Sequence, residues 1–122
     1  MYPIGTKLGV GKVPCVHVGR YMGNGKVFHN HWKNDAEIIT FNQFANDKKV
    51  KVLDQGVQLP QEFTRRVQHL LALNKPYCPL SNNCEHAASY VSGGVASSPQ
   101  LVFYGSLIAL ASVFVLSQSA RA

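Results

Sequence analysis

A cysteine near the start of a short helix is the first residue of this chain that could perform chemistry. Cys84 lies in residues 81–94, SNNCEHAASYVSGG, a stretch typical of a helix that ends at two glycines. Asn82, followed by Glu85 three positions later, resembles a capping box and predicts that Cys84 lies in the first helical turn. There the unpaired backbone N–H groups and the helix dipole stabilise a negative charge, so we expect a thiolate with a lowered pKa.

Histidines on one predicted hairpin could supply the base that a nucleophilic thiol needs. His17 and His29 lie on the two arms of this hairpin, so their side chains can face each other across it. His31 lies two residues beyond His29 and would point to the same side of its strand. A cysteine at a helix start opposite imidazoles on a sheet is the arrangement of activated thiols. A buried, inert cysteine beside structural histidines would leave the same pattern, so both interpretations stay open at this point.

Strands and helices that could position these residues follow from periodicity and turn signals. Asn24-Gly25 supplies the positive φ angles of a tight hairpin turn. Thr40 and Gln43 resemble a capping box, and Pro60 suits the first position of a helix with an apolar stripe from Leu59 to Leu71. The predicted strands are 13–22, 26–31, 37–39 and 50–53, and the predicted helices are 41–46, 60–74 and 83–92.

Composition limits the classes of protein to which the chain can belong. Its 122 residues suffice for one modest core, and its net charge of +6 suits an anionic surface. Lysines and arginines are scattered and no base-stacking motif is present, so we expect no nucleic-acid partner. The three cysteines have no CxxC spacing, which favours a reducing compartment over a disulfide framework. The N-terminal residues lack the apolar core of a signal peptide, so secretion is not indicated.

The C-terminal region differs sharply from the rest, because no Asp, Glu, Lys or Arg occurs from residue 86 to residue 120. Within it, residues 101–116 are mostly apolar and would form a helix of roughly 24 Å, or about 30 Å with their uncharged flanks. The segment is apolar on all sides, which favours a membrane anchor over a buried C-terminal helix of the core. We therefore expect a globular domain over residues 1–98 and a membrane anchor over residues 99–122.

Two motifs resemble a known family. Residues 17–29, HVGRYMGNGKVFH, and residues 83–86, NCEH, resemble the lecithin retinol acyltransferase-like (LRAT-like) family of the NlpC/P60 superfamily. Residues 94–100, which precede the apolar tail, resemble the HRAS-like suppressor phospholipase/acyltransferases. The match spans about residues 2–98, and a small bacterial or viral relative is equally compatible with it. The resemblance implies an α+β, permuted papain-like fold, with an antiparallel sheet packed on the helix that carries the cysteine nucleophile and with a C-terminal apolar helix.

The resemblance also implies roles for the candidate residues. Cys84 corresponds to the nucleophile, His17 to the general base, and His29 to the polar residue that orients the base. The implied reaction is acyl transfer from a phospholipid or another acyl lipid through a Cys84 thioester, without a metal or an organic cofactor. The implied location is a membrane, with the catalytic domain facing the cytoplasm.

The chain departs from the family pattern at several points, and other functions remain open. Ala87 replaces the phenylalanine that follows the box histidine, Arg20 replaces an apolar residue on the first strand, and the segment between His29 and Cys84 is short. A cysteine peptidase or amidase on the same fold is one alternative. Another is a non-catalytic membrane-interaction protein like the picornavirus H-box/NC proteins. A zinc site of His29, His31 and a cysteine is a further possibility, but no matching ligand pair accompanies it.

Overall fold

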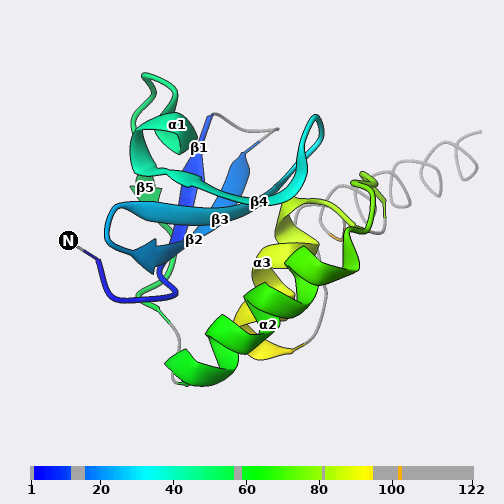
Figure 1. Cartoon of the computed structure of the whole chain (residues 1–122). Helices are drawn as coiled ribbons and strands as arrows, with labels where there is room; N and C mark the ends of the chain where they lie inside the picture. The colour runs from blue at the N-terminus through cyan, green and yellow to red at the C-terminus, as the bar shows by residue number, and fades with distance from the viewer. Residues whose placement is uncertain (1, 12–15, 57–58, 81, 95–101, 103–122) are drawn as a thin grey trace, which may run out of the picture.

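A computed structural model describes residues 2–11, 16–56, 59–80, 82–94 and 102. This part of the chain is an α+β unit in which an antiparallel sheet with the strand order β4-β3-β2-β1-β5 packs against helices (Figure 1). The strands are β1 (Lys7–Val10), β2 (His17–Gly23), β3 (Lys26–His31), β4 (Asp35–Thr40) and β5 (Lys51–Val52). The helices are α1 (Phe41–Ala45), α2 (Pro60–Leu73) and α3 (Cys84–Gly93). The α+β class and the antiparallel sheet predicted for the chain are thus confirmed.

The β2–β3 hairpin forms where the sequence predicts it. Asn24 and Gly25 have φ angles of +52° and +72°, the left-handed values that a two-residue hairpin turn requires. Gly19 lies opposite His29 in this pair, and His29 in turn lies opposite Glu37 of β4. The register therefore brings the histidines of β2 and β3 and the carboxylate of β4 to one region of the sheet.

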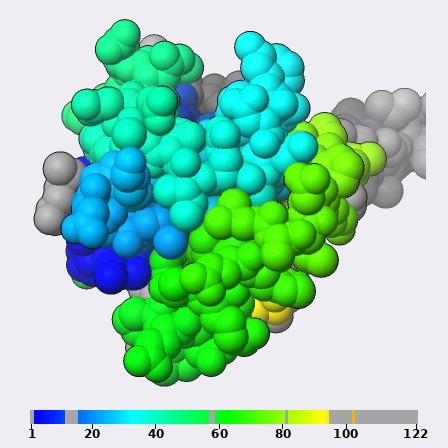
Figure 2. All heavy atoms as spheres, in the orientation of Figure 1, coloured from blue at the N-terminus to red at the C-terminus, as the bar shows by residue number. Residues whose placement is uncertain are grey.

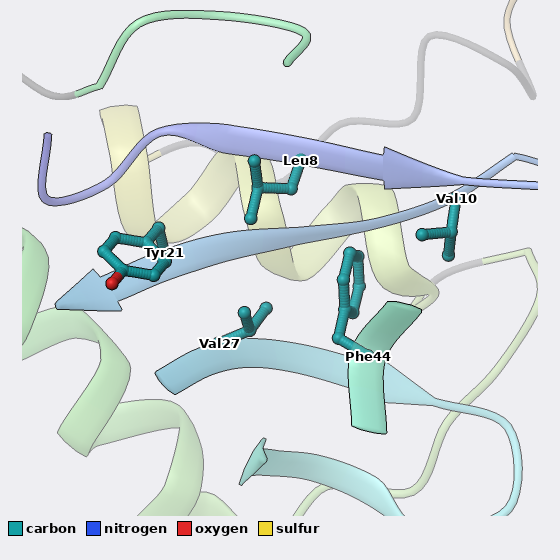
Figure 3. Packing of buried hydrophobic residues seen from close by; sticks show 5 residues of the cluster. All are labelled: Leu8, Val10, Tyr21, Val27 and Phe44. Carbon is teal, nitrogen blue, oxygen red and sulfur yellow. The ribbon is translucent and has the colours of Figure 1, made fainter. Parts of the chain in front are cut away.

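The two faces of the sheet are covered by different helices. Val27 and Tyr21 contribute to a buried cluster with Phe44 of α1, and the same cluster includes Leu8 and Val10 of β1 (Figure 3). Phe28, the next residue of β3, packs on the opposite face with side chains of α2 and α3, namely Phe63, Val67, Ala87 and Val91. Because side chains alternate along a strand, β2 and β3 contribute to both clusters. Figure 1 shows α2 and α3 lying side by side along the sheet.

The helix caps explain where α1 and α2 begin and end. Thr40 and Gln43 form the predicted capping box of α1, with the Gln43 N–H donating to Thr40 Oγ1 at 3.1 Å. α2 begins at Pro60, as predicted, and ends before Asn74, which has a left-handed φ of +49°. Leu59 departs from the predicted apolar stripe, because it precedes the first turn and its side chain is exposed.

Two sequence-based expectations need correction here. The strand expected over residues 13–22 begins only at His17 within the described residues, and β1 was not predicted at all. β1 has four residues and contains Gly9, so it offers little periodicity to detect. The apolar helix expected over residues 101–116, within the anchor segment of residues 99–122, lies outside the described residues, apart from Val102. Among the residues that the structure describes, no helix is long and apolar enough to cross a membrane.

Candidate functional site

A chain of hydrogen bonds joins two histidines and a glutamate on three neighbouring strands. His17 Nε2 lies 2.9 Å from His29 Nδ1, and His29 Nε2 lies 2.9 Å from Glu37 Oε1. His17 is the first residue of β2, His29 lies within β3, and Glu37 lies within β4. The structure therefore brings together the two histidines predicted for the site and adds an acidic residue to them. We call this set, His17, His29 and Glu37, the imidazole relay.

The acceptor at the end of the relay fixes the tautomers of both rings. An ionised Glu37 can only accept a hydrogen bond, so His29 Nε2 carries a proton and donates it. Neutral His29 then has a lone pair on Nδ1, which accepts the hydrogen bond from His17 Nε2–H. His17 Nδ1 is left as the unprotonated nitrogen of its ring. The relay thus turns His17 into a base whose basic atom is Nδ1.

Burial keeps the His17 ring neutral. Its pKa falls from the ordinary value of 6.5 to about 3, first because burial disfavours the cation and then because His29 and His31 are close. The His17 ring centroid lies 5.0 Å from that of His29, 5.5 Å from that of His31 and 5.5 Å from that of Phe44. Burial also lowers the pKa of His29, although the hydrogen bond to Glu37 opposes this shift. At neutral pH both rings of the relay are uncharged.

Cys84 begins α3, as predicted, but a different residue caps the helix. The N-cap is Asn83 rather than Asn82, and its box partner is His86 rather than Glu85. The His86 N–H donates to Asn83 Oδ1 at 3.0 Å, and the Asn83 N–H donates to His86 Nδ1 at 3.2 Å. Cys84 is therefore the first helical residue, and His86 completes the cap of the helix.

The reason for this shift lies in the loop before α3. The Asn82 backbone forms a two-way bridge with Cys78, with N–O distances of 2.9 Å and 3.0 Å. The Asn82 side chain donates to the carbonyl oxygen of Pro76 at 2.9 Å. Because Asn82 holds the loop together, the next asparagine caps the helix.

The thiol of Cys84 is buried against β2. The residue is 8% exposed and packs with Val18, Ala88 and the partly buried Val16. Burial raises the pKa of the Cys84 thiol, although backbone N–H groups of Val18, Glu85 and Cys84 itself favour the thiolate. The lowered pKa expected from the helix start is therefore not what the structure indicates, because loss of water outweighs the N–H groups.

The Cys84 sulfur and the His17 ring approach β2 at neighbouring residues, from its two faces. The Val18 N–H, which interacts with the Cys84 sulfur, belongs to the peptide bond between His17 and Val18. Val18 turns its side chain toward α3, and the next residue back, His17, turns its ring toward Phe44. The sulfur and the imidazole thus lie on two sides of a single peptide unit at the start of β2.

Asn30 fastens the start of α3 to the sheet. Its side chain is 1% exposed, and Nδ2 donates to the carbonyl oxygen of Asn82 at 2.8 Å. Asn30 follows His29 on β3, so one short segment orients His17 from one face and holds the loop before Cys84 from the other. This link ties the loop before α3 to the strand that carries His29.

Arg20 forms a second buried polar network on β2. Its side chain is 5% exposed, and Nη1 lies 2.7 Å and 2.8 Å from the carboxylate oxygens of Asp54. Arg20 also donates to the carbonyl oxygens of Ala88 at 3.1 Å and Gly5 at 3.0 Å. Arg20 therefore ties the middle of α3 to the sheet. The hydrogen bonds and charge of Arg20 lower the pKa of Asp54, although the carboxylate's own burial opposes this.

Glu37 is the site residue that sequence reasoning missed. It was noted only as the start of a short strand, and nothing in its local sequence marks it. The available signal was cross-strand register, because His29 and Glu37 are equidistant from a turn centred on Lys33. His29, rather than His31, makes the hydrogen bond to His17, whereas His31 Nδ1 accepts from the Lys33 N–H at 3.1 Å.

The remaining candidates take simple structural positions. His69 is exposed on α2, and Cys78 is half-buried, while Cys15 lies outside the described residues. Trp32 is not a core residue, because it is 66% exposed. Within the part of the chain that the structure describes, no group of three or more His, Cys, Asp or Glu side chains is arranged to hold a metal ion.

Comparison with known proteins adds no assignment. No protein-family model matches the chain, and the search of curated proteins found no match.

Proposed function

We propose that this protein is a thiol-dependent acyltransferase or phospholipase that transfers acyl groups of lipid esters through a Cys84 thioester. The observation that carries the proposal is the imidazole relay, which ends at His17, the residue before the Val18 N–H that interacts with the Cys84 sulfur. The motifs around His17, His29 and Cys84, which resemble the LRAT-like family, support the same chemistry. The proposal includes a permuted papain-like fold for residues 1–98 and a membrane anchor in residues 99–122, with the catalytic domain facing the cytoplasm.

Acylation begins from a neutral pair of residues. Because the pKa of the Cys84 thiol is raised and that of His17 is lowered, the resting state holds a thiol and an uncharged imidazole rather than an ion pair. As the sulfur attacks the ester carbonyl, its proton passes to His17 Nδ1 and a tetrahedral intermediate forms. The resulting imidazolium donates from Nε2 to His29, and Glu37 balances its charge through the relay.

The second half of the reaction returns the proton. The carbon–oxygen bond of the ester breaks, and the leaving alcohol takes the proton from His17 Nδ1 while the acyl group stays on sulfur. Water, an alcohol or an amine then attacks the thioester, and His17 takes its proton as general base. The carbon–sulfur bond breaks, the acyl product leaves, and the Cys84 sulfur takes the proton back from His17 Nδ1. The backbone N–H groups at the start of α3 favour negative charge and can stabilise the oxyanion of each intermediate.

The decisive experiment measures acyl release from phospholipid vesicles and trapping of the thioester by mass spectrometry. Cys84→Ala should lower turnover by at least about a hundredfold and abolish the acyl adduct, because it removes the nucleophile. Cys78→Ala is the matched control, since this half-buried cysteine lies outside the relay and its variant should turn over substrate normally. Equal turnover by the wild type and Cys84→Ala would end the proposal.

A substrate panel separates this function from the alternatives on the same scaffold. Turnover of acylated peptides or amides without release of lipid acyl chains would assign a peptidase or amidase instead. Absence of any Cys84 adduct with both substrate classes would favour a non-catalytic interaction protein.

A further inference from the structure

Two large apolar side chains stand in solvent beside the candidate site. Trp32 is 66% exposed at the turn between β3 and β4, and Leu80 is 76% exposed in the loop between α2 and α3. Trp32 directly follows His31, and its ring lies 5.7 Å from the His31 ring. Leu80 lies four positions before Cys84. Each residue is therefore close in sequence to one part of the candidate site.

These two loops are joined in space. Asp35 Oδ1 accepts a hydrogen bond from the Tyr77 N–H at 2.8 Å, which ties the β3–β4 turn to the loop before α3. The Asn30 side chain makes a second link, to the carbonyl oxygen of Asn82 at 2.8 Å. Figure 2 shows the end of the β3–β4 hairpin in cyan, standing at the surface beside the yellow-green segment that follows α2. The two loops thus form one surface, which we call the Trp32–Leu80 rim.

Positive charge accompanies the apolar residues of this rim. Lys33 Nζ lies 4.8 Å above the Trp32 ring, and both residues are exposed. Lys75 is exposed on the other loop, near the Tyr77 backbone that Asp35 binds. The nearby acidic groups are used internally, since Asp35 accepts from Tyr77 and Glu37 from His29. The rim therefore presents lysines and apolar side chains together.

We propose that the Trp32–Leu80 rim docks on an anionic lipid surface, with Trp32 and Leu80 entering the headgroup layer and Lys33 and Lys75 contacting anionic headgroups. Tryptophan favours the membrane–water interface, and lysine combines a charged end with an apolar stem that lies along the boundary. The inference rests on the proposed function, because docking here would bring lipid esters to Cys84. A protein partner would fit the exposed apolar residues alone, but the paired lysines favour lipid phosphate.

Trp32 is the only tryptophan of the chain, so its fluorescence reports on the rim directly. The full chain is mixed with vesicles of phosphatidylcholine alone or with phosphatidylserine added, and flotation establishes that the protein is vesicle-bound. With phosphatidylserine, Trp32 emission should shift to shorter wavelength and be quenched by lipids brominated near the headgroup. Flotation detects binding by any part of the chain, including an anchor in residues 99–122, whereas Trp32 emission reports on the rim alone. The two measurements therefore distinguish docking of the rim from anchoring by the C-terminal segment.

Matched variants sharpen the test. Lys33→Gln and Leu80→Ser should each reduce the vesicle-induced quenching, by about fivefold in apparent partition for the lysine. Leu59→Ser is the control, since Leu59 is also exposed, at 64%, but lies at the opposite end of α2 (Figure 1). Cys84→Ala should leave the Trp32 response unchanged, so loss of acyl transfer and loss of docking can be told apart.

Two outcomes would overturn the inference. The first is a Trp32 emission that stays water-like while flotation shows the protein on anionic vesicles. The second is a shift that depends on protein concentration without any lipid, which would assign the rim to contact between copies of the chain.

Discussion

Strand β2 carries two buried polar networks that differ in almost every property. At its start, His17 joins His29 and Glu37 in a relay whose rings are neutral, and burial lowers the pKa of both histidines. Within the same strand, Arg20 makes a charged pair with Asp54 and also donates to carbonyl oxygens of α3 and the N-terminal segment. The first network ends at an unprotonated nitrogen of His17, one residue before the Val18 N–H that interacts with the Cys84 sulfur, whereas the second surrounds its charge with acceptors.

This difference separates a reactive arrangement from a structural one. A buried charge that is fully hydrogen-bonded resists change, and removal of either partner leaves the other uncompensated. A buried neutral imidazole instead holds a lone pair in a site where water is scarce, so it can accept a proton only when a reaction supplies one. We therefore expect changes in the Arg20 network to alter stability and changes in the imidazole relay to alter reactivity.

The largest expected effect is on stability, at Arg20. Arg20→Met should lower the free energy of unfolding by about 3 kcal/mol or more, because Asp54 loses its cationic partner and the carbonyl oxygen of Ala88 loses the Arg20 donor. Urea titration measures this change. Asp54→Asn is the milder companion, since its side chain is 42% exposed and water can replace part of the lost interaction. If Arg20→Met and the wild type unfold at the same urea concentration, the Arg20 network does not stabilise the fold.

Acid should destabilise the fold through the relay. The folded pKa of His17, about 3, lies below the unfolded value of 6.5, so the unfolded chain binds a proton first as the pH falls. The contribution of His17 to the free energy of unfolding is complete above pH 6.5 and is lost as the pH falls toward 3. At pH 4 the loss from His17 alone is about 3 kcal/mol.

Urea titrations at a series of pH values measure this slope. His17→Gln should reduce this slope between pH 6.5 and 4, and His69→Gln, a substitution at an exposed histidine of α2, is the matched control. The lowered pKa of Asp54 acts at more acidic pH, below its unfolded value of 3.8, and so does not mask the histidine effect. An unaltered slope in His17→Gln would refute the buried neutral imidazole.

A smaller effect is expected at Glu37, on activity rather than stability. Glu37→Gln should slow acyl transfer by about tenfold, because an amide stabilises the cationic relay less than a carboxylate does. The Glu37 side chain is 31% exposed, so the change should have little effect on unfolding by urea. Normal turnover by Glu37→Gln would show that Glu37 does not contribute to catalysis.

The fold was largely predictable where local signals decide it. The β2–β3 turn requires positive φ angles that Asn24-Gly25 supplies, and the α1 box and the Pro60 start of α2 formed as expected. The predicted N-cap of α3 was wrong by one residue, because residues 82–86, NNCEH, offer two overlapping capping boxes. Contacts of Asn82 with Cys78 and Pro76 decide between these boxes, and they are not visible in the helix sequence itself.

The site was predictable only in part, since its chemistry depends on contacts distant in sequence. The structure joins His17 to His29 as the hairpin implied, but Glu37 emerges only from the register of the next strand. Arg20 and Asp54 lie 34 positions apart, so no spacing rule links them. The direction of the Cys84 pKa shift also required the structure, because burial, which outweighs the helix start, is a tertiary property.

The central claim is that His17 Nδ1 takes the Cys84 proton during attack, and the pH dependence of Cys84 acylation tests it most directly. An activated ester is added, and the adduct on the Cys84 peptide is quantified over time in the wild type and in His17→Gln. With a base of pKa about 3 and a thiol of raised pKa, the wild-type rate should be nearly constant from about pH 5 to 8. His17→Gln should be slower and should rise about tenfold per pH unit, as for a thiol without a base. The same steep rise in both proteins would contradict the account.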